Sequence, residues 1–452
     1  MSPSESTRKI KAWHVATLLL ALLLIGFGAF RVAMQMRLRD RIAAIRAAGE
    51  PATFAELDTW YKRPALGSNA ADYVTDAFGR LRIPEGEERE LIPLLGATQL
   101  PPRTPPLDPN MQTQIDKLLA DNHEALDLLH QSAGIEQSRY PVDLQRGLSA
   151  LLPHISEMSK AARLLALEAV AHADRGEAEP AAQAIADAYA LARTLLHEPT
   201  MISQTTRYVC NAIAANALER VLNRVVLTES SLAELDGVLR TAHDPNALAN
   251  ALIGQRCLGQ EAFLHPNSVG FGGAQDSQKP SLFAIEARRA IGVLDREWAT
   301  YLDLMQQYVE AARLPASEQL AAFRKTDARY EALPRSYGIV HSIMPSMTTL
   351  VSVDLVNQAR LQTAQTALAV ERYRIATSRL PADLADLVPA YLDGVPEDPF
   401  DGRPLRYKTL HAGYLLYSIG RDETDNGGKE RPPERKDREQ TQYDITFIVE
   451  RP

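Results

Sequence analysis

The longest run of apolar residues in the chain lies close to its N-terminus. No charged residue occurs from Val15 to Phe30, and the run covers residues 12–34 if Arg31 reaches back to the membrane surface. A helix needs about 20 apolar residues to cross the hydrocarbon core of a bilayer. The sequence therefore predicts a single transmembrane signal anchor at 12–34, in contact with membrane lipid, after a cytoplasmic leader at 1–11.

A cleaved signal peptide is the alternative interpretation of this segment. Basic residues precede the apolar run, as they do in signal peptides: Arg8, Lys9 and Lys11. However, no small-residue cleavage site follows at the right distance, and helix-forming residues continue through Arg46. These observations favour an uncleaved anchor whose helix extends beyond the bilayer. Residues 35–110 are then expected to form a juxtamembrane helix and a linker region.

Helical periodicity dominates residues 111–346, which we expect to form an α-helical body. The clearest pair of helices covers 154–174 and 178–196, where alanines on one helix face alanines on the other. Small residues let two helices pack closely, and this pair resembles a tetratricopeptide-type hairpin. Repeat proteins need about three units to bury a continuous core, and one hairpin falls short of that. The prediction is a mainly α protein built on a helical bundle or short solenoid.

The C-terminal residues 347–452 have a different pattern, which predicts a small α+β domain. A helix is expected from Thr348 to about Ala376, because Pro381 disfavours helical geometry in the residue before it. Apolar runs at 404–407 and 414–418 predict two antiparallel strands joined by a tight turn. A third strand is expected at 443–445.

Polar and aromatic residues occur in a specific order within this region. The chain reads Asp398-Pro399-Phe400, Tyr407, residues 414–420, Asp422, Gly427-Gly428 and Asp444-Ile445. This order resembles the globular domain of the major pseudopilin of type II secretion. The resemblance implies an extracytoplasmic module with a calcium-holding loop, whose oxygen ligands would come from Asp422, Asp425, Asp444, Ser418 and Leu416. A solvated acidic turn is the alternative, since Asp, Asn and Gly also form ordinary tight loops.

The sequence also departs from the pseudopilin pattern. Pseudopilins carry a prepilin-peptidase site before their apolar helix and a glutamate near its start. Here Gly26-Phe27 lies inside the apolar run, and Arg31 stands where the glutamate would be needed. Assembly into a pseudopilus by that route is therefore not expected. A charged insertion at 429–438 also lengthens the predicted calcium loop.

Composition narrows the functional classes further. The net charge of -8 gives no basic surface for nucleic acid, which excludes it as an expected partner. Cys210 and Cys257 are interpreted as buried thiols, with one disulfide as the alternative. His123 and His130 share a face of a predicted helix and are interpreted as solvated. No nucleophile elbow, phosphate-binding loop or zinc-binding histidine pair occurs, so the sequence gives no positive case for an enzyme.

Together these patterns predict a membrane-anchored scaffold or partner-docking protein with a calcium-stabilised pseudopilin-like domain. The bulk of the chain would lie on the periplasmic side of the inner membrane. Five arginines follow the uncharged run: Arg31, Arg37, Arg39, Arg41 and Arg46. Their number argues for the opposite orientation, although long domains translocate largely regardless of flanking charge. Two alternatives are an accessory component of a type II secretion or pilus-like apparatus, which would bind pseudopilin-like proteins, and an enzyme with an unrecognised site in the helical body.

Overall fold

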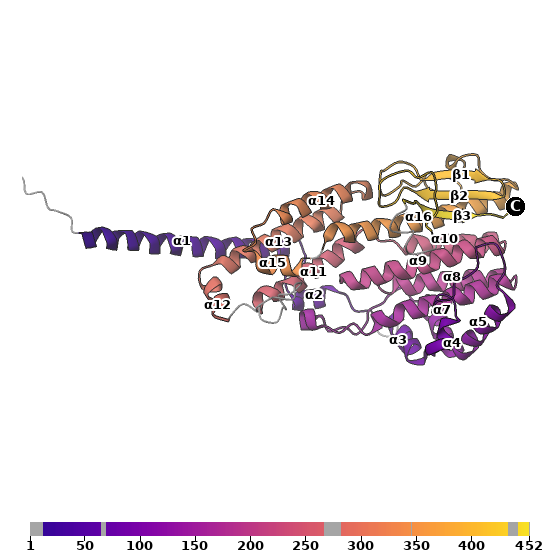
Figure 1. Ribbon diagram of the computed structural model, residues 1–452, viewed down its shortest axis with the longest axis horizontal. Helices are drawn as coiled ribbons and strands as arrows, with labels where there is room; N and C mark the ends of the chain where they lie inside the picture. The colour runs from indigo at the N-terminus through magenta and orange to yellow at the C-terminus, as the bar shows by residue number, and fades with distance from the viewer. Residues whose placement is uncertain (1–11, 65–68, 266–281, 345, 433–441, 452) are drawn as a thin grey trace, which may run out of the picture.

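Helices run through most of the computed structural model, which describes residues 12–64, 69–265, 282–344, 346–432 and 442–451. Three short strands near the C-terminus form the one sheet of these described residues (Figure 1). The predicted fold class, mainly α with a small antiparallel sheet and an apolar N-terminal helix, is therefore confirmed. The predicted leader at 1–11 and residues 433–438 of the charged insertion lie outside the described residues.

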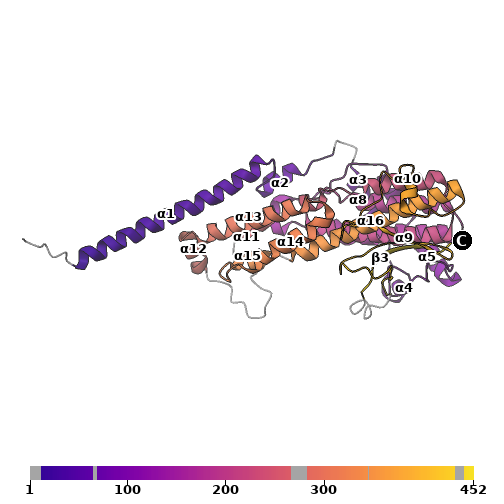
Figure 2. The same ribbon diagram turned by 90° about the horizontal axis from the view of Figure 1, so that it is seen from above.

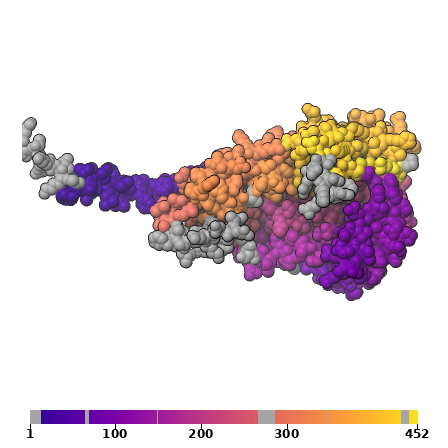
Figure 3. Space-filling model, in the orientation of Figure 1, coloured from indigo at the N-terminus to yellow at the C-terminus, as the bar shows by residue number. Residues whose placement is uncertain are grey.

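The apolar N-terminal run forms the first part of helix α1 (Ala12–Ala47), which projects from the body (Figures 1 and 3). At about 1.5 Å per residue, its apolar residues 12–30 extend about 29 Å, close to the thickness of a hydrocarbon core of about 30 Å. No part of its most apolar window is buried against the protein. An uninterrupted exposed apolar helix of this length fits a single-pass membrane anchor, and a signal sequence has the same pattern.

The second half of α1 is fixed to helix α13 (Val293–Ala312). Leu38 and Ile45 are buried in the core that α13 helps to form. Arg31 pairs with Asp295 at 2.9 Å, and Asp303 accepts Arg37 at 2.9 Å and Arg41 at 2.6 Å. Arg46 pairs with Glu56 at 2.8 Å. Four of the five arginines that follow the apolar run therefore have a structural role in the fold.

Two groups of helices make up the body (Figure 2). The group beside α1 consists of α11 (Ala247–Leu264), α12 (Leu282–Ala290), α13, α14 (Ala316–Glu331) and α15 (Gly338–Ile343). The group farther from α1 consists of α3 (Ala70–Arg80), α4 (Gly86–Glu90), α5 (Pro109–Asp121), α6 (His123–Ala133), α7 (His154–Asp174), α8 (Ala178–Arg193), α9 (Met201–Arg224) and α10 (Glu229–Thr241). The short helices α2 (Phe54–Trp60) and η1 (Leu144–Ser149) contact each other and α11.

Helix α16 (Met347–Thr377) runs through the hydrophobic cores of both groups. Val351 and Leu355 belong to the core beside α1, whereas Leu361 and Leu368 belong to the core farther away, which also contains Leu416 of the sheet. By length and composition, the stretch from α15 through α16 passes for a second membrane span. However, about half of it is buried inside the body, so we assign α16 to the core. Its buried face also includes four polar side chains: Asp354, Asn357, Gln358 and Glu371.

The sheet follows α16 after a short helix, η2 (Leu384–Leu387), and a proline-rich loop. Its strands are β1 (Arg406–Leu410), β2 (Gly413–Ser418) and β3 (Ile445–Val449), paired antiparallel in the order β1-β2-β3. The hairpin is where the sequence places it, but β1 begins two residues later than predicted. The third strand begins at Ile445 instead of ending there, because Asp444 is used to hold the loop before it.

The outer edge of β3 is covered by helix α9. Asn223 donates to the carbonyl oxygen of Ile448 at 2.8 Å and accepts the N–H of Glu450 at 2.7 Å. Glu219 accepts the N–H of Ile448 at 3.0 Å. Side chains of α9 thus satisfy the backbone groups that a fourth strand would otherwise pair with.

The two cysteines are free and buried, which agrees with their interpretation as buried thiols and not with the disulfide alternative. Cys210 lies on α9 and Cys257 on α11, where it donates to the carbonyl oxygen of Pro51 at 3.2 Å. Burial raises the pKa of each thiol to about 12. Both thiols therefore stay protonated and unreactive near neutral pH.

We expect substitutions in the docked half of α1 to release this helix from α13. Leu38→Ala or Ile45→Ala removes a buried side chain from the contact, and such deletions cost about 2–5 kcal/mol. Trypsin should then cleave the full chain in detergent faster at the arginines between residues 37 and 46. Met36→Ala, which changes an exposed residue of the same helix, is the control. Equal cleavage of all variants would contradict the docked geometry.

Candidate functional site

The predicted calcium loop is held together by Asp444. Its carboxylate is buried and accepts the backbone N–H groups of Asn426 at 3.2 Å, Gly428 at 2.6 Å and Lys429 at 3.3 Å. Burial raises the pKa of this carboxyl group above its ordinary value, although the backbone hydrogen bonds oppose the shift. Asp444 therefore organises the loop between β2 and β3 from inside.

The other predicted ligands lie near this loop but each has its own hydrogen bonds. Asp422 accepts the N–H of Thr424 at 3.2 Å and the side-chain amide of Asn426 at 2.9 Å. Asp425 accepts the N–H of Gly427 at 2.8 Å. The described residues contain no group of three or more His, Cys, Asp or Glu arranged to hold a metal ion. Calcium would have to replace hydrogen bonds that now close the loop, and its binding stays a prediction.

Ser418 and Leu416, the two ligands predicted from strand β2, face a different environment. Leu416 is buried in the middle of β2, opposite Tyr407 and Phe447. Ser418 is buried at the end of β2 and donates to the carboxylate of Asp398 at 2.8 Å.

Asp398 is itself completely buried, and it accepts the N–H of Ile419 at 2.9 Å and pairs with Arg406. The resemblance includes Asp398 as part of a pattern, but its role in fixing the end of β2 was not predicted.

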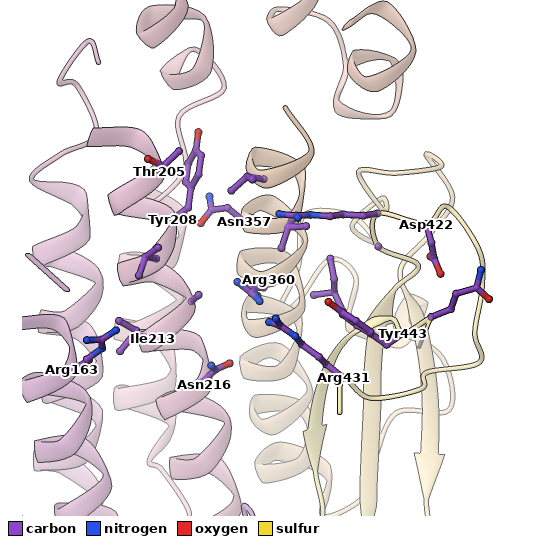
Figure 4. A pocket seen from close by; sticks show the side chains of 18 residues that line it. Arg163, Thr205, Tyr208, Ile213, Asn216, Asn357, Arg360, Asp422, Arg431 and Tyr443 are labelled. Carbon is purple, nitrogen blue, oxygen red and sulfur yellow. The ribbon is translucent and has the colours of Figure 1, made fainter. Parts of the chain in front are cut away.

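A pocket of about 590 Å³ opens beside this loop, between α7, α9, α16 and the segment that follows β2 (Figure 4). We call it the arginine pocket, because four arginines line it: Arg163 of α7, Arg360 of α16, and Arg421 and Arg431 of the segment between β2 and β3. Asp422 is the one carboxylate among its described lining residues. Figure 4 shows Arg360 and Arg431 extending toward the same part of the pocket.

Arg421 and Arg431 are exposed, whereas Arg163 and Arg360 are partly buried and can be compared with the arginines of the interior. Arg256 is paired with Glu50 at 2.8 Å, Arg139 with Asp58 at 2.6 Å, and Arg207 donates to Gln204 at 2.8 Å. Among the described residues, by contrast, no carboxylate forms an ion pair with any of the four pocket arginines. Burial lowers the pKa of Arg360, and repulsion from Arg431 and Arg421 lowers it further. Positive charge is thus concentrated here without a described ion-pair partner.

His130 is 33% exposed at its side chain but is bound to carboxylates, which the interpretation as a solvated residue did not include. Its ring lies between two carboxylates, with Nδ1 at 2.6 Å from Asp187 of α8 and Nε2 at 3.2 Å from Glu168 of α7. Burial alone would lower its pKa, but the hydrogen bonds and attraction of the two carboxylates outweigh this and raise the pKa to about 10. His123, about two helical turns before His130 on the same helix, is exposed. Helical spacing placed both on one face but gave no information on what packs against it.

Compared with family models, curated proteins and solved structures, the chain matches none of them. Inference about its function therefore rests on the geometry above and on the order of the C-terminal residues.

We call the contact of His130 with the carboxylates of Asp187 and Glu168 the His130 clamp. This clamp predicts that the stability of the protein depends on pH. The folded pKa of about 10 lies above the ordinary value of 6.5, so the stabilisation is complete below pH 6.5 and is lost as the pH rises toward 10. The unfolding free energy of the wild type should therefore fall more between pH 7 and pH 10 than that of His130→Gln. His123→Gln, at an exposed position on the same helix, should follow the wild type. Parallel pH curves for wild type and His130→Gln would refute the clamp.

Proposed function

We propose that the protein is a membrane-anchored docking protein, with its body outside the cytoplasm and its sheet at the end far from the membrane. One observation carries this proposal. The apolar half of α1 is bare, while its second half is fixed to α13 through Leu38, Ile45 and ion pairs to Asp295 and Asp303. A body attached in this way is held in a defined orientation above a membrane, as a docking protein requires.

The arginines after the apolar run are compatible with a body on the extracytoplasmic side. Their number would favour a body in the cytoplasm if these arginines served only to set the orientation of the anchor. Arg31, Arg37 and Arg41 are bonded to aspartates of α13 instead, so the fold gives an independent reason for their presence. The pseudopilin-like order of the C-terminal residues supports the periplasmic face of the inner membrane, and we propose that location.

An accessory role in a type II secretion or pilus-like apparatus is the second candidate. A long helix, α16, is followed by η2, a hairpin and a third antiparallel strand, which is the order of elements that the resemblance implies. In this role the sheet and α16 would contact pseudopilin-like proteins. The calcium loop would then be stabilised by Asp422, Asp425 and Asp444 with oxygen atoms of Ser418 and Leu416, since calcium favours oxygen ligands from a loop.

Labelling of single engineered cysteines tests the orientation. Cys210 and Cys257 are buried, so a membrane-impermeant maleimide should give little background. Asp393 is 90% exposed at its side chain, and Asp393→Cys should be labelled in spheroplasts. Ser4→Cys in the leader should be labelled after the membrane is opened. The reverse pattern would place the body in the cytoplasm, and a mature chain that lacks residues 1–11 would exclude an uncleaved anchor.

Thermal unfolding of the full chain tests the calcium loop. Calcium should raise the unfolding midpoint relative to a chelator, because an ion that binds only the folded state stabilises it. The double variant Asp422→Asn and Asp425→Asn should lose this rise, since it removes two exposed carboxylates without disturbing buried Asp444. Asp393→Asn is the matched exposed control. Identical midpoints with calcium and with chelator would rule out the metal site.

A further inference from the structure

We propose that the arginine pocket binds a small phosphate ester that carries an apolar group. This inference goes beyond docking and does not depend on the orientation of the protein in the membrane. It rests on the charges that line the pocket, on a buried donor without a partner, and on the apolar side chains at its other wall.

Unbalanced positive charge is the first argument. Four arginines and one described carboxylate, Asp422, line the pocket in a chain whose overall net charge is -8. Arg163 and Arg360 are partly buried, and a buried charge without a partner is costly. An anion in the pocket would supply the partner that Arg163 and Arg360 lack among the described residues, and exposed Arg421 and Arg431 could contact it as well.

Buried Asn357 gives an independent indication of a ligand. It lines the arginine pocket and is 2% exposed. Its Oδ1 accepts the side-chain amide of Asn211 at 2.9 Å. Its Nδ2 and the Oδ1 of Asn211 are both buried and have no hydrogen-bond partner among the described residues. Such a donor normally has an acceptor in the folded state. An anionic ligand in the pocket would provide one.

Phosphate fits this lining better than a single carboxylate does. A phosphate monoester carries a charge of about −1.5 to −2 at pH 7 and offers three strong acceptor oxygens, so several arginines can bind it together. A carboxylate has one charge and two oxygens, which would leave most of the cluster uncompensated. Guanidinium groups also match the geometry of phosphate oxygens in a bidentate manner.

The apolar wall indicates what the phosphate is attached to. Side chains from α9, α16 and the start of β3 line the same pocket: Val209, Ile213, Val353, Val356 and Ile445. Asn216 and Gln442 lie among the lining residues as further polar contacts. An ester with a small apolar group would place its phosphate on the arginines and bury its apolar part here. Inorganic phosphate should therefore bind more weakly than such an ester.

Calorimetry on the full chain in neutral detergent at low salt tests this proposal, with phenyl phosphate as the probe. We expect saturable binding that weakens with added salt. Arg360→Gln and Arg431→Gln should each weaken it about tenfold or more, because a charge-assisted hydrogen bond contributes about 1.5–3 kcal/mol. Arg403→Gln, at an arginine whose side chain is 80% exposed, should leave it unchanged. No binding, or equal binding by all variants, would overturn the proposal.

Stability without ligand separates a ligand-binding arginine from a structural one. Arg360→Gln removes a partly buried charge that has no ion pair among the described residues, so the free protein should be at least as stable as the wild type. Destabilisation by this variant together with unchanged phenyl phosphate binding would assign Arg360 a structural role instead.

Two further probes identify the source of the anion. Dihexanoyl phosphatidic acid in place of phenyl phosphate tests a lipid headgroup: tighter binding would indicate lipid, and weaker binding a soluble ester. The carboxylates Glu434, Asp437 and Glu439 lie outside the described residues, so a variant with glutamine or asparagine at these positions tests an internal counter-charge. If phenyl phosphate binds only to that variant, these carboxylates supply the counter-charge and the proposal of an external ligand fails.

Discussion

Helix α16 sets the relative position of the two halves of the body. Its 31 residues extend about 46 Å at 1.5 Å per residue, and side chains along this length are buried in one hydrophobic core and then in the other. Because a packed helix resists bending, the sheet cannot shift against the bundle beside α1 without breaking one of these cores. Residues 347–452 also share a hydrophobic core with helices α7 to α10. A fragment that begins at Met347 would therefore expose the face of α16 that packs on these helices.

The same helix explains where the arginine pocket lies. Along α16, Ala359 belongs to the core beside α1 and Leu361 to the other, and Arg360 lies between them. The arginine pocket opens at this boundary, between α9, α16 and the segment between β2 and β3. Charged residues from three parts of the chain meet there, and none of the arginines faces a described ion-pair partner. The pocket thus lies where α16 passes from one core to the other.

Local patterns predicted much of the fold, whereas the pocket depends on distant contacts. Residues 154–174 match α7, and the hairpin is near its predicted place, because periodicity and turn residues act over a few positions. The arginine pocket combines residues 163, 360, 421 and 431, and no local spacing relates them. His130 shows the same limit, since its partners Asp187 and Glu168 lie on other helices. The order around Asp398 was visible, but not its burial.

The contact between α9 and β3 limits how copies of this sheet can associate. A sheet that is open at both edges can pair with a neighbour on each side and extend without limit. Here Asn223 and Glu219 occupy the backbone groups of β3, so β1, with Arg406 and Lys408, is the edge strand whose outer side has no strand partner among the described residues. One open edge allows a single pairing event, which ends in a closed dimer. By strand pairing, this chain would terminate a growing fibre and not propagate it.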